Sequence, residues 1–295
     1  MYKCCEVRKL LRLLALDGII FTLIAGFFML GRLLLTYAEH SGTSDEVKLP
    51  VIMYHSVCDR QPAEYSVTPQ QAESDLKWLR DNGYTAVSAD EVIRFTRQKG
   101  TLPEKPVMIT LDDGFYNNYS EFLPLLEKYD MRAVVSVVGS YADNDAVNDP
   151  HEPAYSYLTW EDMKLLTASG RVELGNHTYA MHSLSGGRTG CSKMPGETAE
   201  DYRGVLREDI WDMQTETALM TGTTPVVFAY PFGAVSRESI PVIREAGILM
   251  TLTCREQVNT ITHDPDCLYG IGRFNRSGLY STASFMDNVF SYEKQ

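Results

Sequence analysis

From about residue 50 onward, short apolar runs alternate with amphipathic helical patterns, and this alternation restricts the fold more than any other feature. The runs have the length and the aliphatic composition of strands that are buried on both faces. They lie at 51–54, 84–88, 106–111, 133–138, 172–175, 225–230, 248–254 and 269–274. Strands that are separated by helices pair in parallel, so about eight of them predict an α/β fold, a distorted (β/α) barrel of seven or eight strands.

The helical segments between these runs have recognisable ends. At 68–83, Thr68 is followed by Pro69 and Gln71, which is typical of a capping box with a proline in the first turn. Further helices are expected at 159–170, 198–221 and 236–246. Two long polar connections are predicted to be loops beside the carboxyl ends of the strands, at 139–157 and 183–197.

The N-terminal part of the chain has a different composition. Residues 10–37 are mostly apolar and long enough to cross a bilayer as one helix, and the Lys and Arg residues before them favour a cytoplasmic N-terminus. We therefore expect a cytoplasmic tail and a single-pass signal anchor at 1–38, a linker at 39–49 and an extracellular domain at 50–295. The alternative is a signal peptide that is cleaved after Ala38, which would make the domain a secreted one.

Charge and cysteine content exclude several classes of protein. The formal net charge is −12, and such an acidic chain lacks the clustered Lys and Arg residues that nucleic-acid binding needs. None of the 6 cysteines forms a Cys-x-x-Cys pair, which argues against a zinc ribbon or a redox motif. Cys254 and Cys267 remain candidates for one extracellular disulfide, and the sequence leaves this open.

Two adjacent carboxylates, Asp112 and Asp113, come directly after the apolar run 106–111. Two carboxylates on adjacent residues repel each other, which raises the pKa of each. A divalent cation would remove the repulsion. His177 and His182 follow another predicted strand, so both groups are expected at the same edge of the sheet. One carboxylate and two imidazoles make an open three-ligand site of the kind that catalytic metal ions use.

Other readings of these residues remain. His177 and His182 are five residues apart, whereas the two histidines of a helical metalloprotease motif are four residues apart. A turn or loop would therefore have to bring both histidines to one metal ion. The two histidines can also be ordinary loop residues, with Asp113 capping a helix that begins near Asn117. A non-haem iron oxygenase uses the same donor set, but usually on an antiparallel barrel.

Three segments carry a family resemblance. They are Thr-Leu-Asp-Asp-Gly-Phe at 110–115, Asn-His-Thr-Tyr-Ala-Met-His at 176–182 and Phe-Ala-Tyr-Pro-Phe-Gly at 228–233. In this order they resemble the motifs of the polysaccharide deacetylases, carbohydrate esterase family 4, over residues 50–275. The resemblance implies that Asp112 is the catalytic base and that Asp113, His177 and His182 bind a divalent metal ion, zinc before cobalt, nickel or iron.

The chain departs from the commoner family pattern in three respects. Its histidines are spaced His-x-x-x-x-His, Ala229 stands where the third motif often has Arg, and the late Leu-His that usually supplies the catalytic acid has no counterpart near 269–276. The histidine spacing, Tyr-Pro-Phe-Gly at 230–233 and Val-Ile-Met-Tyr-His-Ser-Val at 51–57 resemble the branch that acts on exported poly-N-acetylglucosamine. That resemblance implies His55 as the catalytic acid.

The implied activity is hydrolysis of the N-acetyl group of N-acetylglucosamine residues in peptidoglycan or in poly-N-acetylglucosamine. An O-acetyl esterase on a glycan and a non-catalytic glycan-binding protein are the alternatives. Tyr230, Pro231 and Phe232 are candidates for binding the substrate and its oxyanion, and Arg273 or Arg276 for orienting Asp112. The candidates for stacking on a sugar ring are Phe115, Trp160, Tyr179 and Tyr230.

Overall fold

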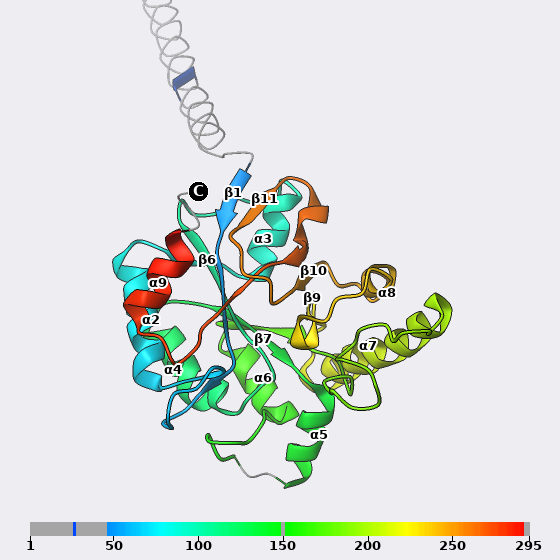
Figure 1. Cartoon of the computed structure of the whole chain (residues 1–295). Helices are drawn as coiled ribbons and strands as arrows, with labels where there is room; N and C mark the ends of the chain where they lie inside the picture. The colour runs from blue at the N-terminus through cyan, green and yellow to red at the C-terminus, as the bar shows by residue number, and fades with distance from the viewer. Residues whose placement is uncertain (1–25, 28–45, 149–150, 292–295) are drawn as a thin grey trace, which may run out of the picture. The chain divides into compact units, whose positions relative to one another are not determined.

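The structure is a computed structural model that describes residues 26–27, 46–148 and 151–291. The chain divides into two units, Met1–Asp45 and Glu46–Gln295, and the second contains every element discussed below (Figure 1). The expected tail and anchor lie outside the described residues, apart from 26–27, and so does the expected linker up to 45. Among the helices that the structure describes, none is long and apolar enough to span a membrane.

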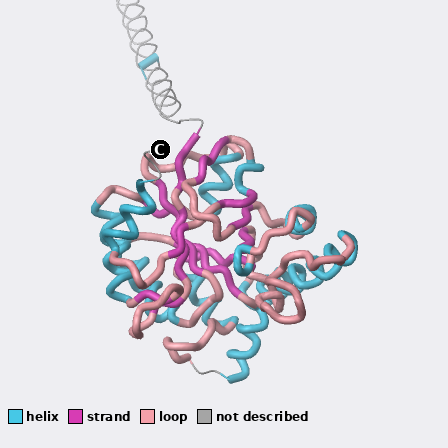
Figure 2. Tube along the Cα trace, viewed as in Figure 1, coloured by secondary structure: helices cyan, strands magenta, loops and turns pink. Residues whose placement is uncertain are grey.

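A curled parallel sheet forms the centre of the domain (Figures 1 and 2). Its strands follow the order β12 (Tyr269–Ile271), β10 (Met250–Leu252), β9 (Val227–Ala229), β8 (Val172–Asn176), β7 (Ala133–Val137), β6 (Pro106–Leu111), β2 (Val51–Tyr54) and β13 (Phe274–Asn275), and β5 (Thr85–Ala86) pairs with β6. All these pairs are parallel. The two edge strands β12 and β13 are separated in the chain only by Gly272 and Arg273, so the sheet must curl until its edges approach. The α/β fold with a parallel sheet is thus confirmed, and its curl is consistent with a (β/α) barrel.

Helices surround this sheet, with α2, α4 and α9 to one side and α7 and α8 to the other in Figure 1. The helices are α2 (Pro69–Asp81), α3 (Ala89–Thr96), α4 (Leu123–Tyr129), α5 (Gly139–Asn148), α6 (Trp160–Ala168), α7 (Ala199–Thr221), α8 (Ser239–Glu245) and α9 (Thr282–Ser291). Short turns of helix occur at η1 (Asn118–Phe122), η2 (Pro231–Gly233) and η3 (Pro265–Leu268). The remaining strands are β1 (Glu46–Leu49), paired with β11 (Asn259–Thr262), and β3 (Ser56–Val57), paired with β4 (Ser66–Val67). The capping box of Thr68 and Gln71 is present at the start of α2, as predicted.

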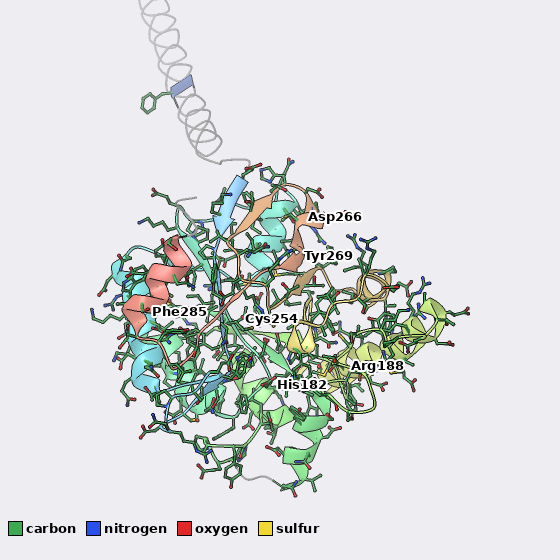
Figure 3. All side chains as sticks on the ribbon, viewed as in Figure 1. His182, Arg188, Cys254, Asp266, Tyr269 and Phe285 are labelled. Carbon is green, nitrogen blue, oxygen red and sulfur yellow. The ribbon has the colours of Figure 1, made fainter. Side chains whose placement is uncertain are left out.

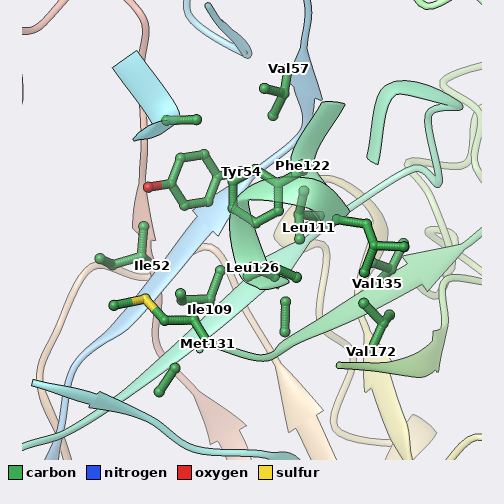
Figure 4. Packing of buried hydrophobic residues seen from close by; sticks show 14 of the residues in the cluster. Ile52, Tyr54, Val57, Ile109, Leu111, Phe122, Leu126, Met131, Val135 and Val172 are labelled. Carbon is green, nitrogen blue, oxygen red and sulfur yellow. The ribbon is translucent and has the colours of Figure 1, made fainter. Parts of the chain in front are cut away.

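The burial of the central strands explains why apolar runs in the sequence predicted them. Every residue of β2, β6 and β7 is buried, because helices cover one face and the curled interior fills the other. Figure 4 shows side chains from these strands, such as Ile52, Ile109 and Val135, packed against Phe122 and Leu126 of the covering helices. Burying one such side chain contributes about 1.5–3 kcal/mol to stability, which favours continuous apolar runs in these strands.

The structure corrects three predictions of local structure. The polar segment 139–157 is a loop only in part, because 139–148 forms α5. This helix is tied down by its acidic side chains: Asp143 accepts hydrogen bonds from the side chains of Trp160 and Tyr179, and Asp145 from the backbone of Tyr157. Because polar contacts attach α5 to the domain, its sequence lacks the apolar periodicity from which a helix is predicted.

The other two corrections concern the C-terminal third of the chain. The predicted strand 269–274 breaks at Gly272–Arg273 into two strands on opposite edges of the sheet. The predicted helix 236–246 is shorter, at Ser239–Glu245. Cys254 and Cys267 are both free, so the disulfide that the sequence allowed is not formed.

Candidate active site

A pocket of about 620 Å³ lies at the carboxyl ends of the central strands. Figure 3 labels two of its lining residues, His182 and Cys254. The lining residues are Met53, His55, Glu64, Tyr65, Asp112, Asp113, Phe115, His177, His182, Phe232, Cys254, Glu256, Asn275, Ser277, Leu279 and Tyr280. Asp112, Asp113, His177, His182 and His55 thus meet in one place, as the positions after parallel strands predicted.

Asp113, His177 and His182 offer three ligand atoms that lie within 4.8 Å of one another. The Oδ1 atom of Asp113 is 3.5 Å from Nε2 of His177 and 3.1 Å from Nε2 of His182. The other ring nitrogens are occupied: Nδ1 of His177 lies 2.8 Å from the carbonyl oxygen of Ala229, and Nδ1 of His182 lies 3.0 Å from the hydroxyl of Tyr141. A proton on each Nδ1 leaves both Nε2 atoms able to bind a metal ion. The residues therefore fit a divalent metal with two nitrogen ligands and one oxygen ligand.

Charge interactions within this set are strong. Burial raises the pKa of Asp113, but hydrogen bonds to His177 and His182 outweigh it and hold the pKa far below its ordinary value. Burial lowers the pKa of His177, whereas the carboxylates of Asp112 and Asp113 raise it, and the net shift is upward. The pocket thus favours a positive charge beside Asp113, which a divalent cation would supply in place of protons.

The turn after β6 separates the two carboxylates. Asp113 and Gly114 both have positive φ, 72° and 71°, which costs energy for a residue other than glycine. A Cβ atom on Gly114 would lie 2.8 Å from Cγ1 of Val137, so the neighbouring strand leaves no room for a side chain there. The sharp turn directs Asp113 to the histidines, while Asp112 continues the strand and faces another partner.

That partner is Arg273, from the closing segment between β12 and β13. Its guanidinium donates two hydrogen bonds of 2.7 Å to the two oxygens of Asp112, and it is completely buried. Burial alone would raise the pKa of Asp112, but the Arg273 charge outweighs it and lowers the pKa. Asp112 is therefore ionised at neutral pH and fixed in orientation. Arg276, the other candidate, pairs instead with Asp75.

His55 follows β2 and packs its ring edge-on against Tyr65, with 4.9 Å between the ring centroids. Its Nδ1 atom is buried and has no hydrogen-bond partner in the part of the chain that the structure describes. Burial lowers the pKa of His55, and the carboxylates of Asp112 and Asp113 offset only part of that shift. The free imidazole is therefore neutral near pH 7.

The candidates for substrate binding differ in how far their side chains are exposed. Phe232 is 46% exposed and lies with its ring centroid 4.6 Å from that of His182. Tyr230 is buried, its hydroxyl bonds to Ser239, and its backbone N–H donates to the carbonyl of Leu252. The side chain and amide of Tyr230 are thus already engaged, which leaves Phe232 as the better candidate for an oxyanion donor.

Of the four aromatic residues for which sugar stacking or core packing was open, one lies at the pocket. Phe115 lines the pocket, but Trp160, Tyr179 and Tyr230 do not. Trp160 is buried, and the hydroxyl of Tyr179 donates to Asp143, so these rings support the fold instead. Tyr65 and Tyr280, both exposed and both on the pocket wall, went unnoticed because no motif surrounds them.

A further residue that sequence reasoning missed is Asp209 of α7. Its carboxylate accepts hydrogen bonds of 2.8 Å from the backbone N–H groups of both Tyr179 and Ala180, between the two histidine ligands. Thr178 begins this turn with a φ of 72°. One buried carboxylate thus fixes the turn that brings His182 back to His177, although the two histidines are five positions apart.

We expect Asp209→Asn to weaken zinc binding about 10- to 100-fold, as loss of supporting contacts around metal ligands commonly does. The amide of Asn replaces one acceptor oxygen with an NH2 donor, and the turn offers only N–H groups here, so one hydrogen bond is lost. Competition with a chelating dye measures the affinity. Asp212→Asn is the matched control, because Asp212 is exposed on the same helix. Unchanged zinc affinity in folded Asp209→Asn would contradict this role.

Comparison with known proteins agrees with this geometry. A family model described as polysaccharide deacetylase matches residues 99–251, just over half of the chain. The chain belongs to the polysaccharide deacetylase family. This membership covers the turn after β6 and the loop with both histidines, but His55 and Arg273 lie outside the matched residues.

Individual relatives point to one branch of the family. A poly-β-1,6-N-acetyl-D-glucosamine N-deacetylase of Escherichia coli (strain K12) is 29% identical over 223 residues, 68% of this chain and 33% of the relative. The chain thus spans about a third of that relative's length. An enzyme of the same name from Staphylococcus aureus (strain MRSA252) is 23% identical over 208 residues, 70% of this chain and 68% of the relative.

Solved structures show the same fold. IcaB from Ammonifex degensii has a TM-score of 0.68 at 22% identity, covering 84% of this chain and 97% of that one. A de-N-acetylase from Aggregatibacter actinomycetemcomitans has a TM-score of 0.68 at 24% identity, covering 82% and 100%. At these identities the likeness concerns the fold.

Proposed function

We propose that this protein is a metal-dependent deacetylase that removes the N-acetyl group from N-acetylglucosamine-type residues of a cell-wall or extracellular polysaccharide. The observation that carries the proposal is the division of the carboxylate pair. Asp113 joins His177 and His182, while Asp112 stays outside this set, ionised and held by Arg273. The names of the relatives support poly-N-acetylglucosamine as the substrate class, with peptidoglycan as the other.

The residues divide the work of amide hydrolysis. A divalent metal ion held by Asp113, His177 and His182 would supply a Lewis acid that acidifies water and polarises the acetyl carbonyl. Asp112 takes a proton from the water that attacks the acetyl carbon. The backbone N–H of Phe232 is the proposed donor to the oxygen that becomes negative. His55 gives a proton to the departing nitrogen, the C–N bond breaks, and acetate and a free amine result.

The low pKa of His55 determines how it obtains that proton. Because the resting imidazole is neutral near pH 7, the proton has to arrive during the reaction. In the proposed reaction its source is the attacking water, and Asp112 is the first acceptor of that proton. His55 is then a relay whose low pKa makes it a strong donor once charged.

Metal removal tests the proposal directly. Acetate release is measured from N-acetylglucosamine oligomers of β-1,4 and β-1,6 linkage and from purified peptidoglycan. We expect chelation to abolish release, and zinc, cobalt, nickel or iron to restore it to different extents. Full activity in protein that elemental analysis shows to be metal-free would refute the metal dependence. The substrate with the highest kcat/KM separates the two polysaccharide classes.

The second candidate is an O-acetyl esterase on a glycan, because the same residues could also hydrolyse an ester. An alcohol leaves more readily than an amine and depends less on an acid. The two candidates differ in their dependence on His55. His55→Gln should abolish acetate release from an N-acetylated oligomer, and an esterase would retain most of its activity on an O-acetylated one.

For the N-terminal segment we propose the role that its composition suggests: residues 1–38 anchor the domain at 50–295 to the outer face of the cell membrane. Fractionation of cells that express the chain with and without residues 1–38 tests this. Recovery of the full chain in the soluble fraction, at its full mass, would contradict anchoring.

A further inference from the structure

One side of the pocket takes no part in the proposed mechanism. It includes Glu64 from the connection between β3 and β4, Glu256 from the connection between β10 and β11, and Asn275 at the end of β13. We call these three residues the acceptor wall. They lie near the seam where β12 and β13 approach, whereas the metal-ligand residues follow β6 and β8.

The acceptor wall is built on segments that are tied together. The side-chain amide of Asn275 donates to the backbone carbonyl of Glu64, at 3.1 Å, and the backbone N–H of Gly278 donates to the carbonyl of Ala63, at 2.8 Å. A Cβ atom on Gly278 would lie 2.1 Å from the carbonyl oxygen of Ser66, so the two segments touch. This part of the pocket is therefore formed before any ligand arrives.

A buried ion pair also holds the segment that follows β13. Arg276 is completely buried and donates to Asp75, at 2.6 Å to Oδ2, and to the backbone carbonyls of Ser277 and Tyr280. The side-chain amide of Gln71 adds a hydrogen bond of 2.9 Å to the carbonyl of Gly278. These contacts fix the loop that follows β13 and, through Asn275, the backbone of Glu64.

The chemistry of the wall is one-sided. Oδ1 of Asn275 is buried and without a hydrogen-bond partner among the described residues, and its orientation follows from the bond that its amide nitrogen makes. Glu64, which lies beside the hydroxyl of Tyr65, and Glu256 add two exposed carboxylates, and no Lys or Arg side chain from the described residues lines the pocket. Acceptors with negative charge fit a ligand group that is a cation and carries several donors.

We propose that the acceptor wall binds the protonated free amine of a glucosamine unit that neighbours the acetylated unit at the metal site. This inference rests on the proposed function, since that reaction itself produces such amines. An ammonium group has three donors and one positive charge, which match the wall. The pocket falls within the range of about 300–1,000 Å³ that holds whole ligands, so it admits more than an acetamido group. The protein then prefers partly deacetylated chains to fully acetylated ones.

Three oligomers of equal length test the preference, each with one acetylated unit in the same position. Its neighbours carry free amines in the first, acetamido groups in the second and hydroxyl groups in the third. We expect kcat/KM for the first to exceed that for the third about three- to tenfold, the range for two partly exposed charge interactions. Added salt should reduce the ratio, because it screens exposed charges. Equal values for the first and third would overturn the inference.

Variants locate the preference on the wall. In Glu64→Gln/Glu256→Gln the ratio should fall toward one, while Glu104→Gln, an exposed acid outside the pocket, should keep the wild-type ratio. A ratio that survives in the double variant would refute the assignment.

A binding measurement separates this inference from the proposed function. A fully deacetylated oligomer contains nothing to hydrolyse, and calorimetry measures its affinity whether or not the protein is active. We expect the double variant to bind it at least threefold more weakly than the wild type, and equal affinity would contradict the wall. No turnover of any acetylated oligomer, with this binding intact, would refute the deacetylase alone.

Discussion

Replacing Asp112 with Asn is expected to lower kcat for acetate release by about two to four orders of magnitude, with zinc binding preserved. The substitution keeps the shape of the side chain but removes the group that takes the proton from water. Asp112 is 3% exposed and outside the ligand set, so the variant should still bind one metal ion. Single-turnover acetate release checks the loss of activity, and metal content measured on the same preparation checks that zinc binding is preserved.

Asp113→Asn is the matched variant for this test. It changes the adjacent residue in the same turn, but it removes a metal ligand, so metal content and activity should fall together. Undiminished turnover in Asp112→Asn would refute the assignment of the base. Loss of metal in both variants would show that the two carboxylates share one role.

Replacing Arg273 with Met is expected to destabilise the fold by about 3–5 kcal/mol, because it leaves the buried charge of Asp112 without a partner. In the wild type the pKa of Asp112 is lowered, so the pair contributes stability that is present above the unfolded pKa and is lost as the pH falls through the folded pKa. In the variant, burial is opposed only by the charges of His177 and His55, so the pKa of Asp112 should rise above its value in the wild type. Its destabilisation should therefore be greatest at neutral pH and diminish as the pH falls.

The same change should move the acidic limb of the kcat/KM profile to higher pH, because Asp112 becomes protonated earlier. Arg276→Met is the control. It also removes a fully buried arginine from a buried aspartate, Asp75, and should destabilise the fold comparably, but the acidic limb should stay in place. Denaturant unfolding at several pH values and pH–rate profiles measure these effects. An acidic limb that shifts equally in both variants would show that Arg273 acts only through stability.

The sequence was informative wherever a local pattern reflects a local cause. Central strands such as β6 are buried on both faces, so they have to be apolar throughout, and the runs found them. Polar residues that end these strands have to meet at one edge of a parallel sheet. Asp112, Asp113, His177 and His182 therefore came together in the pocket as predicted.

The sequence was less informative wherever an element is held in place by residues that are distant in the chain. Helix α5 was missed because hydrogen bonds to its acidic side chains, rather than an apolar stripe, attach it to the domain. For Trp160 and Tyr230 the sequence left sugar stacking and core packing open, since an aromatic residue near a motif has the same letter whether it is buried or exposed.

The sequence alone thus determined the parallel α/β architecture, the family resemblance and the residues at the strand ends, because strand burial and motif spacing are local properties. Only the tertiary structure decided which arginine serves Asp112. Arg273 and Arg276 lie three positions apart, but the first reaches Asp112 across 161 residues and the second reaches Asp75 across 201. The acceptor wall likewise joins Glu64 to Asn275 across 211 residues. Such contacts follow from the curl that brings the sheet's edges together, and no short pattern records it.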